Sequence, residues 1–279
     1  GIRATDLFNP TGSFYAAQDL VMALTGRLAH GGVIGAGRDA TVSAAAIEGA
    51  ASSLFAAGLR ADGRLTEAGT LSLAAREILV AHGQNLAGGG LTLQAGQLDV
   101  AGSQTSAHGV TLVADRVDAR AAEFLASGTF QARVGGLLDT RLARVSAQQV
   151  NIQAGSLDNA DGELVHTGRD DMQLVLPGNL TNTRGRIASN GTTLRLGAET
   201  LDNSAGSIEH AGTGDLLIGA STFDGTSGQI RSNGHLDLAA SRVELDRART
   251  AAERVSITAD TISHRYGELH QTGSGLATL

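Results

Sequence analysis

The sequence predicts an all-β fold, specifically a parallel β-helix (β-solenoid). Three features support this prediction: a phrase of eight residues recurs at intervals of 21 to 23 residues, apolar and polar residues alternate inside each repeat, and the chain has 38 glycines but only 3% aromatic residues. Alternation sends every second side chain to the same face of a strand. A period of about 20 residues is too short for helical hairpin repeats, which need roughly 33 residues or more. One repeat therefore fits one coil of a β-solenoid.

The repeated phrase is clearest between residues 156 and 241. Its copies are LDNADGEL from Leu157, LTNTRGRI from Leu180, LDNSAGSI from Leu201 and FDGTSGQI from Phe223. Each copy is followed by a second glycine and by an apolar-x-apolar pair. We expect the inward side chains of successive coils to stack about 4.8 Å apart. A single coil has no core of its own, so the coils are expected to stabilise one another only by stacking.

Two columns of apolar residues extend this register along the chain, with steps of 19 to 23 residues. The first column is Leu71, Leu91, Val110, Phe130, Val150, Met172, Leu194, Leu216, Leu236, Val255 and Leu276; the second is Ile78, Leu98, Val117, Leu138, Leu157, Leu180, Leu201, Phe223, Val243 and Ile262. They predict about 13 coils of about 20 residues each, stacked into a rod on the order of 60 Å long at one strand spacing per coil. Leu196 and Ile218 should be buried neighbours, whereas Arg195 should point outward.

The pattern predicts one repeat segment, residues 1–279, cut from a longer chain. Residues 71–279 carry regular repeats, and residues 1–70 are expected to form irregular coils. The alanine-rich stretch IEGAASSLFAAG from Ile47 is expected to form a wide loop or a short helix.

Composition excludes several classes of function. A net charge of -7 argues against nucleic acid as a partner, because phosphate binding requires a basic surface. The absence of cysteine removes disulfides, thiolate metal sites and thiol nucleophiles. No apolar run reaches the length of a membrane-spanning helix, about 18 residues or more. No residues point to a cofactor or a metal site.

The phrases from Leu157, Leu180 and Leu201, each followed by Gly-x-x-x-Leu-x-Leu or a close variant, resemble the repeats of the filamentous haemagglutinin family. These are bacterial exoproteins of the two-partner secretion route, a group that includes contact-dependent growth-inhibition proteins. The resemblance implies a right-handed parallel β-helix, the shaft of a filament that is secreted through an outer-membrane transporter to the bacterial cell surface. The segment Asn9-Pro10-Thr11 departs from the Asn-Pro-Asn motif of the family's secretion domain, and we interpret it as a repeat corner.

The candidate sites are two rows of polar residues. Asn159, Asn182 and Asn203 should form a ladder of stacked amides that stabilises the turns. Asp202, Asp224 and Glu244 should form an outward acidic stack, the kind of arrangement from which β-helix lyases and hydrolases build catalytic or calcium sites. A solvated acidic stripe explains the same pattern, and we predict no catalytic, cofactor-binding or metal-binding residue.

Two further sets of polar residues are expected to be ordinary surface residues. His166, His210 and His270 should lie on the surface with His166 and His210 about 10 Å apart, too far for one metal ion to bridge. The arginines Arg116, Arg120, Arg133, Arg141 and Arg144 could align into a weak patch for sulfated glycans, but scattered exposed charge more often serves solubility.

The sequence therefore predicts a structural protein, a shaft that mediates adhesion to host cells or neighbouring bacteria, with a host-cell receptor or glycan as its partner. It leaves two alternatives open: the stalk of a contact-dependent growth-inhibition filament that meets a receptor on a target bacterium, and a β-helix polysaccharide lyase or glycosidase.

Overall fold

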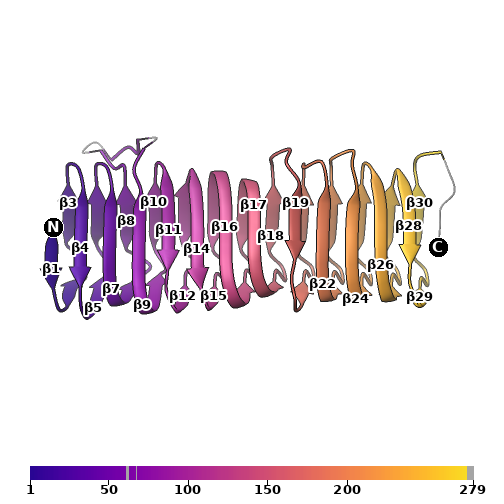
Figure 1. Ribbon diagram of the computed structural model, residues 1–279, viewed down its shortest axis with the longest axis horizontal. Helices are drawn as coiled ribbons and strands as arrows, with labels where there is room; N and C mark the ends of the chain where they lie inside the picture. The colour runs from indigo at the N-terminus through magenta and orange to yellow at the C-terminus, as the bar shows by residue number, and fades with distance from the viewer. Residues whose placement is uncertain (61–62, 67, 275–279) are drawn as a thin grey trace. The chain divides into compact units, whose positions relative to one another are not determined.

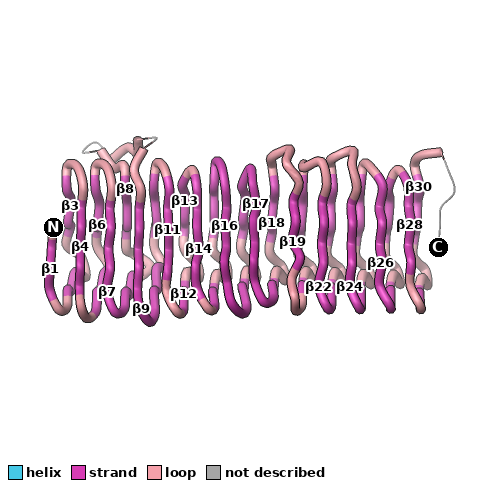
Figure 2. Tube along the Cα trace, viewed as in Figure 1, coloured by secondary structure: helices cyan, strands magenta, loops and turns pink. Residues whose placement is uncertain are grey.

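The computed structural model describes residues 1–60, 63–66 and 68–274, and it divides into two compact units, Gly1–Leu138 and Asp139–Leu279. Each unit is a parallel β-solenoid, and about 13 coils are formed in all (Figure 1). Every regular element among the described residues is a strand, as Figure 2 shows by its single strand colour. The predicted all-β solenoid is thus confirmed. None of the described segments is a helix of the length and apolarity that a membrane span requires.

The first unit contains three columns of parallel strands. Its strands are β1 (Ile2–Ala4), β2 (Leu7–Asn9), β3 (Ser13–Ala16), β4 (Leu20–Leu24), β5 (Arg27–His30), β6 (Val33–Ala36), β7 (Ala40–Gly49), β8 (Leu54–Ala57), β9 (Leu71–Ala81), β10 (Gln84–Ala87), β11 (Gly90–Gln94), β12 (Gln97–Asp99), β13 (Gln104–Ala107), β14 (Gly109–Ala114), β15 (Arg116–Asp118) and β16 (Glu123–Asp139), whose last residue belongs to the second unit. One column joins β1, β4, β7, β9, β11 and β14, a second joins β2, β5, β7, β9, β12 and β15, and a third joins β3, β6, β8, β10 and β13.

The second unit repeats this arrangement. Its strands are β17 (Arg144–Asp158), β18 (Glu163–His166), β19 (Met172–Val175), β20 (Leu180–Thr181), β21 (Arg186–Ser189), β22 (Leu194–Asp202), β23 (Ser207–His210), β24 (Leu216–Asp224), β25 (Gln229–Ser232), β26 (His235–Glu244), β27 (Arg249–Ala252), β28 (Arg254–Thr258), β29 (Thr261–Ser263) and β30 (Glu268–Gln271). Long strands such as β22, β24 and β26 bend at a corner and so belong to two columns, the first with β19 and β28 and the second with β20 and β29. The third column joins β18, β21, β23, β25, β27 and β30.

The register of these strands matches the two predicted apolar columns at almost every position. In the second unit Leu194 pairs with Leu216 and Leu216 with Leu236, as predicted for the first column. One residue is wrong: Leu98 pairs with Leu79, not with Ile78, because Leu79 is the fully buried inward residue of β9. The last predicted member of the first column, Leu276, lies outside the described residues.

The core of each unit is a narrow stack of inward side chains. In the second unit Leu196 and Ile218 are register partners and are 1% and 2% exposed, which confirms the prediction that they are buried neighbours. The larger rings lie at the same inward positions, for example Phe124 and Phe130 in the first unit, whose ring centroids are 5.3 Å apart at an edge-to-face angle. Apolar burial in these stacks is the main favourable term for folding, since no coil encloses a core alone.

The coils before residue 58 use the same three columns as the later ones, although we expected them to be irregular. The stretch from Ile47 forms the end of β7, a turn and the whole of β8, so the prediction of a wide loop or a short helix is wrong. The insertion comes later, after β8, where Leu59 and Leu65 form an isolated antiparallel bridge. Alanine was misleading because at inward positions of a narrow coil it packs as well as a larger residue, and Ala56 and Ala57 are fully buried.

Truncation of the core should distinguish inward from outward positions. We expect Leu196→Ala and Ile218→Ala each to lower the free energy of unfolding by about 2 to 5 kcal/mol, because each leaves a cavity in a stack that cannot collapse. Arg195→Ala, in the same strand but exposed, should change it by less than about 0.5 kcal/mol. Urea unfolding followed by circular dichroism measures these losses, and equal losses at Leu196 and Arg195 would contradict the observed orientation.

Candidate functional site

The most regular polar feature of the chain is the turn between the second and third strand columns. From Gly102 onward, each of these turns contains one residue with a left-handed backbone. In the second unit these residues include Asp161, Arg184, Ala205 and Ser227, with φ between 53° and 57°. Glycine and asparagine are the residues that normally accept a positive φ, yet none of these four is either one. Non-glycine residues here pay a steric cost that L-residues normally avoid, and a backbone hydrogen bond closes each turn, as from Gly162 to the carbonyl of Asn159 at 3.0 Å.

The glycine that follows the left-handed residue is required for space. A Cβ at Gly206 would overlap the carbonyl oxygen of Asn182 in the preceding coil, and a Cβ at Gly185 would overlap that of Asn159. The φ values of these glycines are not positive, so close approach and not backbone freedom explains them. The asparagine and the glycine of the Asn-x-x-Gly phrase are thus coupled between coils, because the asparagine of one coil contacts the glycine of the next coil.

The three predicted ladder asparagines are brought together at this turn. All three are fully buried. The side-chain amide of Asn159 donates to Oδ1 of Asn182 at 2.8 Å, and that of Asn182 donates to Oδ1 of Asn203 at 2.7 Å. Sequence analysis missed the first member, Thr140, whose hydroxyl donates to Oδ1 of Asn159 at 3.1 Å. The ladder ends in the next coil, where Gly225 stands in place of asparagine.

Each amide also bonds to the backbone of its own turn. Nδ2 of Asn182 lies 3.3 Å from the carbonyl oxygen of Gly185 and 3.2 Å from that of Ser207 in the next coil. The ladder therefore supplies hydrogen-bond donors to buried carbonyl groups that water cannot reach. A buried carbonyl without a donor would destabilise the fold.

The predicted acidic stack is also in register, because Asp202 pairs with Asp224 and Asp224 with Glu244. The three side chains are half-buried rather than fully solvated. Oδ1 of Asp202 accepts the N–H of Ser204 at 2.8 Å, and its Oδ2 accepts the hydroxyl of Thr183 at 2.8 Å. These bonds are typical of an Asx turn, in which the carboxylate caps the backbone two residues on.

The same capping recurs along the row. Asp224 accepts the N–H of Thr226 at 2.9 Å, and Glu244 pairs instead with Arg242. Four further aspartates accept the amide N–H two residues on in the same way, and sequence analysis did not identify them: Asp99, Asp118, Asp139 and Asp158. The signal that could have found them is their position, immediately after a member of the second apolar column. Each of these carboxylates therefore stabilises its own turn.

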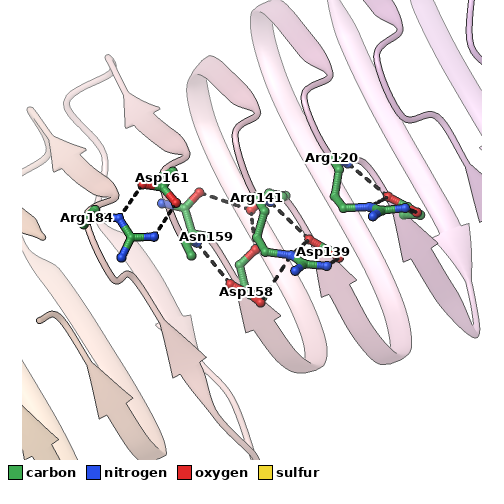
Figure 3. A network of polar contacts seen from close by, with 10 residues as sticks. Arg120, Asp139, Arg141, Asp158, Asn159, Asp161 and Arg184 are labelled. Carbon is green, nitrogen blue, oxygen red and sulfur yellow. Dashed lines mark hydrogen bonds and ion pairs between the residues drawn. The ribbon is translucent and has the colours of Figure 1, made fainter.

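A network of ion pairs covers the outside of these turns in the second unit (Figure 3). Arg184 lies 2.7 Å from Asp161 of the previous coil, and Arg141 lies 2.6 Å from Asp139 and 3.5 Å from Asp158. The hydrogen bond from the Arg184 guanidinium lowers the pKa of Asp161, although this exposed pair is screened by solvent.

Opposite charges also meet between successive coils of the third strand column. Arg144 lies 3.1 Å from Glu163, Glu163 lies 2.8 Å from Arg186, and Arg186 lies 2.7 Å from Glu209. Hydrogen bonding by Arg186 lowers the pKa of Glu209, and the bond to Glu209 raises the pKa of Arg186. Three of the five arginines considered as a glycan patch therefore form ion pairs: Arg120, Arg141 and Arg144. The positive charge of these three is balanced by neighbouring carboxylates.

Asp246 is the most strongly perturbed acid of the turns. The backbone N–H of Arg265 donates to it at 2.8 Å, the hydroxyl of Ser263 at 2.7 Å and the Arg265 guanidinium at 2.8 Å. These bonds, the backbone one first, lower the pKa of Asp246 to about 2. The carboxylate therefore stays ionised wherever the protein is folded at ordinary pH.

The prediction that the three histidines lie on the surface is wrong for two of them. His166 and His210 are 1% and 2% exposed, and only His270 is exposed. The reason is that the corner after the third strand column accepts an inward polar residue, which alternates between histidine and serine as His166, Ser189, His210 and Ser232.

Hydrogen bonds hold both histidines in place. Nδ1 of His166 lies 2.9 Å from Oγ of Ser189, and that oxygen also accepts the N–H of Gly191 at 3.1 Å. Because a hydroxyl oxygen has two lone pairs, the serine can donate to Nδ1 or accept from it. Burial lowers the pKa of His166, partly opposed by the charge of Asp170. The Ser–His contact has the composition of a nucleophile and its base, but its two residues are each 1% exposed.

The described residues contain no group of three or more His, Asp or Glu side chains placed to hold a metal ion. Two open grooves lie on the strand faces, one in each unit. The groove of the first unit measures about 540 Å³ and is lined mostly by small residues such as Ala74, Ala75 and Ala95. The groove of the second unit measures about 380 Å³ and is lined by Gly197, Gly219 and their neighbours.

Removal of the central amide should show how much the ladder contributes. Asn182→Ala leaves the amide of Asn159 without its acceptor and Oδ1 of Asn203 without its donor, so we expect a loss of about 1 to 3 kcal/mol in the free energy of unfolding. The exposed Asn179 is a matched control, and Asn179→Ala should change stability by less than about 0.5 kcal/mol. Similar effects in the two variants by urea titration would show that the ladder contributes nothing.

The left-handed residue and the following glycine should respond in opposite ways. Ala205→Gly removes a strained Cβ and should raise the free energy of unfolding by about 0.5 to 1 kcal/mol. Gly206→Ala should lower it by about 1 to 3 kcal/mol because its Cβ meets the backbone of the preceding coil. Ala239→Gly, in a regular strand, should lower stability by about 0.5 to 1 kcal/mol. Destabilisation by Ala205→Gly would contradict the assigned backbone.

Buried His166 should make stability depend on pH. Because its folded pKa is lowered, the unfolded chain binds a proton that the folded chain does not as pH falls below about 6.5, so stability decreases in that direction. We expect His166→Ser, which copies the residue of the next coil, to reduce the change in unfolding free energy between about pH 7 and pH 5. The exposed His270→Ser should leave this slope unchanged, and an unchanged slope in both variants would contradict the assignment.

Comparison with known proteins agrees with the coil structure. The model of the haemagglutinin repeat matches residues 2–66, 40–115, 95–150, 113–183 and 169–261. A curated relative named Toxin CdiA, from Yersinia pestis, is 33% identical over 218 residues, which cover 74% of this chain and 7% of the relative. The chain thus spans a small part of that relative's length. No solved structure matches this chain.

The family match and the structure describe the same unit. The repeat model covers most of both solenoid units, and the phrases on which the resemblance rested, from Leu157, Leu180 and Leu201, form the stacked turns of the asparagine ladder. The chain therefore belongs to the haemagglutinin-repeat family of filamentous haemagglutinin-like proteins.

Proposed function

We propose that this chain is a shaft segment of a secreted bacterial surface filament, which holds a separate functional region away from the cell. The observation that carries the proposal is that polar groups of the turns are satisfied by neighbouring coils: the asparagine ladder and the ion pairs between successive coils both connect one coil to the next. Such a unit can be repeated without changing its cross-section, which suits a spacer.

Two finer roles are compatible with a shaft. The relative named Toxin CdiA favours the stalk of a filament that delivers a toxin to neighbouring bacteria. The adhesion role that we expected first, toward a host cell or a neighbouring bacterium, is supported by membership of the haemagglutinin-repeat family. We place the toxin-delivery stalk first because the relative named as a toxin is similar in sequence over most of this chain. In either role the filament is exported through an outer-membrane transporter.

A coil deletion in the complete secreted protein tests the shaft role. Removal of residues 180–200 joins Asn179 to Leu201, which is the register partner of Leu180, so one whole coil is lost and the stack closes again. We expect export and function to persist. Removal of residues 180–189 takes out a partial coil and should abolish export of a folded, protease-resistant protein. Loss of function in both deletions, with export intact in the first, would assign a specific binding role to that coil and contradict the spacer role.

The same strains separate the two finer roles. In co-culture with sibling bacteria that lack immunity, a toxin-delivery filament should inhibit the siblings only on contact, whereas an adhesin should increase attachment to host cells or neighbouring bacteria without inhibition.

We also propose that the segment has no catalytic activity of its own. The support is that Asp202 and Asp224 both accept hydrogen bonds from their own turns, so both have the same structural role. A lyase or glycosidase needs two acids whose environments give them different roles. Incubation with pectins, glycosaminoglycans and bacterial glycans, with and without calcium, should release no new reducing ends or unsaturated products. Activity that disappears in Asp224→Asn would overturn this proposal and favour a lyase or glycosidase.

A further inference from the structure

One outward strand face of the second unit has an ordered pattern of charge. Strands β19, β22, β24, β26 and β28 lie side by side on it (Figure 1). The residue between the two inward positions of each strand points outward, and the register places these residues in one row. The row reads Gln173, Arg195, Leu217, Asp237 and Ser256.

A row of small residues runs beside this one. Val175 pairs with Gly197, Gly197 with Gly219, and Gly219 with Ala239. They form the floor of the groove of about 380 Å³, which Arg195, Leu217 and Asp237 also line. Val175 is 56% exposed, and a Cβ at Gly219 would meet only open space. The face therefore has room for a partner's side chains.

The two charged residues of the row differ from most charges around them. Among the described residues neither Arg195 nor Asp237 forms an ion pair, whereas Arg184, Arg186 and Arg242 all do. Arg195 and Asp237 are two coils apart, about 10 Å at the strand spacing, with Leu217 midway between them. Each charge thus lacks an ion-pair partner among the described residues, and Leu217 lies midway between the two.

This pattern is self-complementary, and we propose that the face is an interface between two copies of this chain. A two-fold axis that lies in the interface, parallel to the strands and at Leu217, reverses the order of the coils. It places Leu217 on the partner's Leu217, Arg195 on the partner's Asp237 and Gln173 on the partner's Ser256. Both copies use the same patch, as a two-fold interface requires.

The charges select this orientation among the face-to-face arrangements. A two-fold axis perpendicular to the strands would place Arg195 on its own copy and Asp237 on its own copy, which is repulsive. The neighbouring outward row supports the antiparallel arrangement because it places Asp171 on the partner's Arg254. One like-charge contact opposes it, because Asp215 faces its own copy. It occurs once, whereas the opposite-charge contacts of Arg195 and of Asp171 each occur twice in a two-fold dimer.

Charge exchange on the 279-residue chain tests the interface. By sedimentation velocity over a concentration series, we expect a monomer–dimer equilibrium. Arg195→Asp and Asp237→Arg alone should each raise the dissociation constant by about tenfold or more. The double variant Arg195→Asp with Asp237→Arg should restore dimer formation, because the pairs form again with their charges exchanged. Arg249→Asp, on the third strand column, is the control and should leave the equilibrium unchanged.

A cysteine cross-link tests the symmetry. The chain has no cysteine, so Leu217→Cys introduces a single thiol at the two-fold axis, where packed sheet faces place the two copies about 10 Å apart. We expect a covalent dimer with a bifunctional thiol reagent of about that span. Gln173→Cys, on the same row but about 20 Å from its own copy at four strand spacings, should not cross-link.

Three results would overturn the proposal: a monomer at all concentrations, self-association that is insensitive to both single charge variants, or a double variant that is no better than the single ones. Unchanged circular dichroism and urea unfolding in every variant distinguish loss of the interface from loss of folding.

Discussion

The structure depends on one constraint, the hydrogen bonding of each strand to the strand one coil earlier and one coil later. Because the pairing is parallel and in register, a residue always lies beside the equivalent residue of its neighbours, as Leu194 lies beside Leu216. A residue type that recurs at one position therefore forms a row along the unit: apolar residues form a core column and amides form a ladder. Charged residues are satisfied in two ways, by a turn hydrogen bond within the coil, as at Asp202, or by an opposite charge in the next coil, as at Arg144 and Glu163.

The constraint explains which parts of the structure the sequence could predict. Inward positions and the asparagine ladder were predictable because a period-two pattern and a shared step determine both orientation and neighbour. The off-by-one error at Ile78 arose where three apolar residues in succession, from Ile78 to Val80, hide the alternation. The prediction for the stretch from Ile47 was wrong for a similar reason, since alanine carries little information about which side of a strand is buried.

Polar residues were harder to place than apolar ones. His166 and His210 were predicted to lie on the surface, yet each ring forms a hydrogen bond with a serine in the adjacent coil, which makes its burial tolerable. The capping aspartates were found in only part of their row, because a carboxylate bonded to a turn amide and a solvated one look alike in sequence. The left-handed residues could not be predicted at all: alanine, serine, arginine and aspartate occupy the same position, and the turn rather than the side chain selects the backbone.

The asparagine ladder also has a direction. Thr140 donates to Asn159, Asn159 to Asn182 and Asn182 to Asn203, so every side-chain hydrogen bond points toward the C-terminus of the chain. If the unit forms from its N-terminal end, the last completed coil presents an amide donor, and the asparagine side chain and a backbone carbonyl of the next coil supply its acceptors. The ladder is therefore directional: the donor of a folded coil sets the position of the next asparagine. Coils can then be added toward the C-terminus while the earlier hydrogen bonds stay as they are.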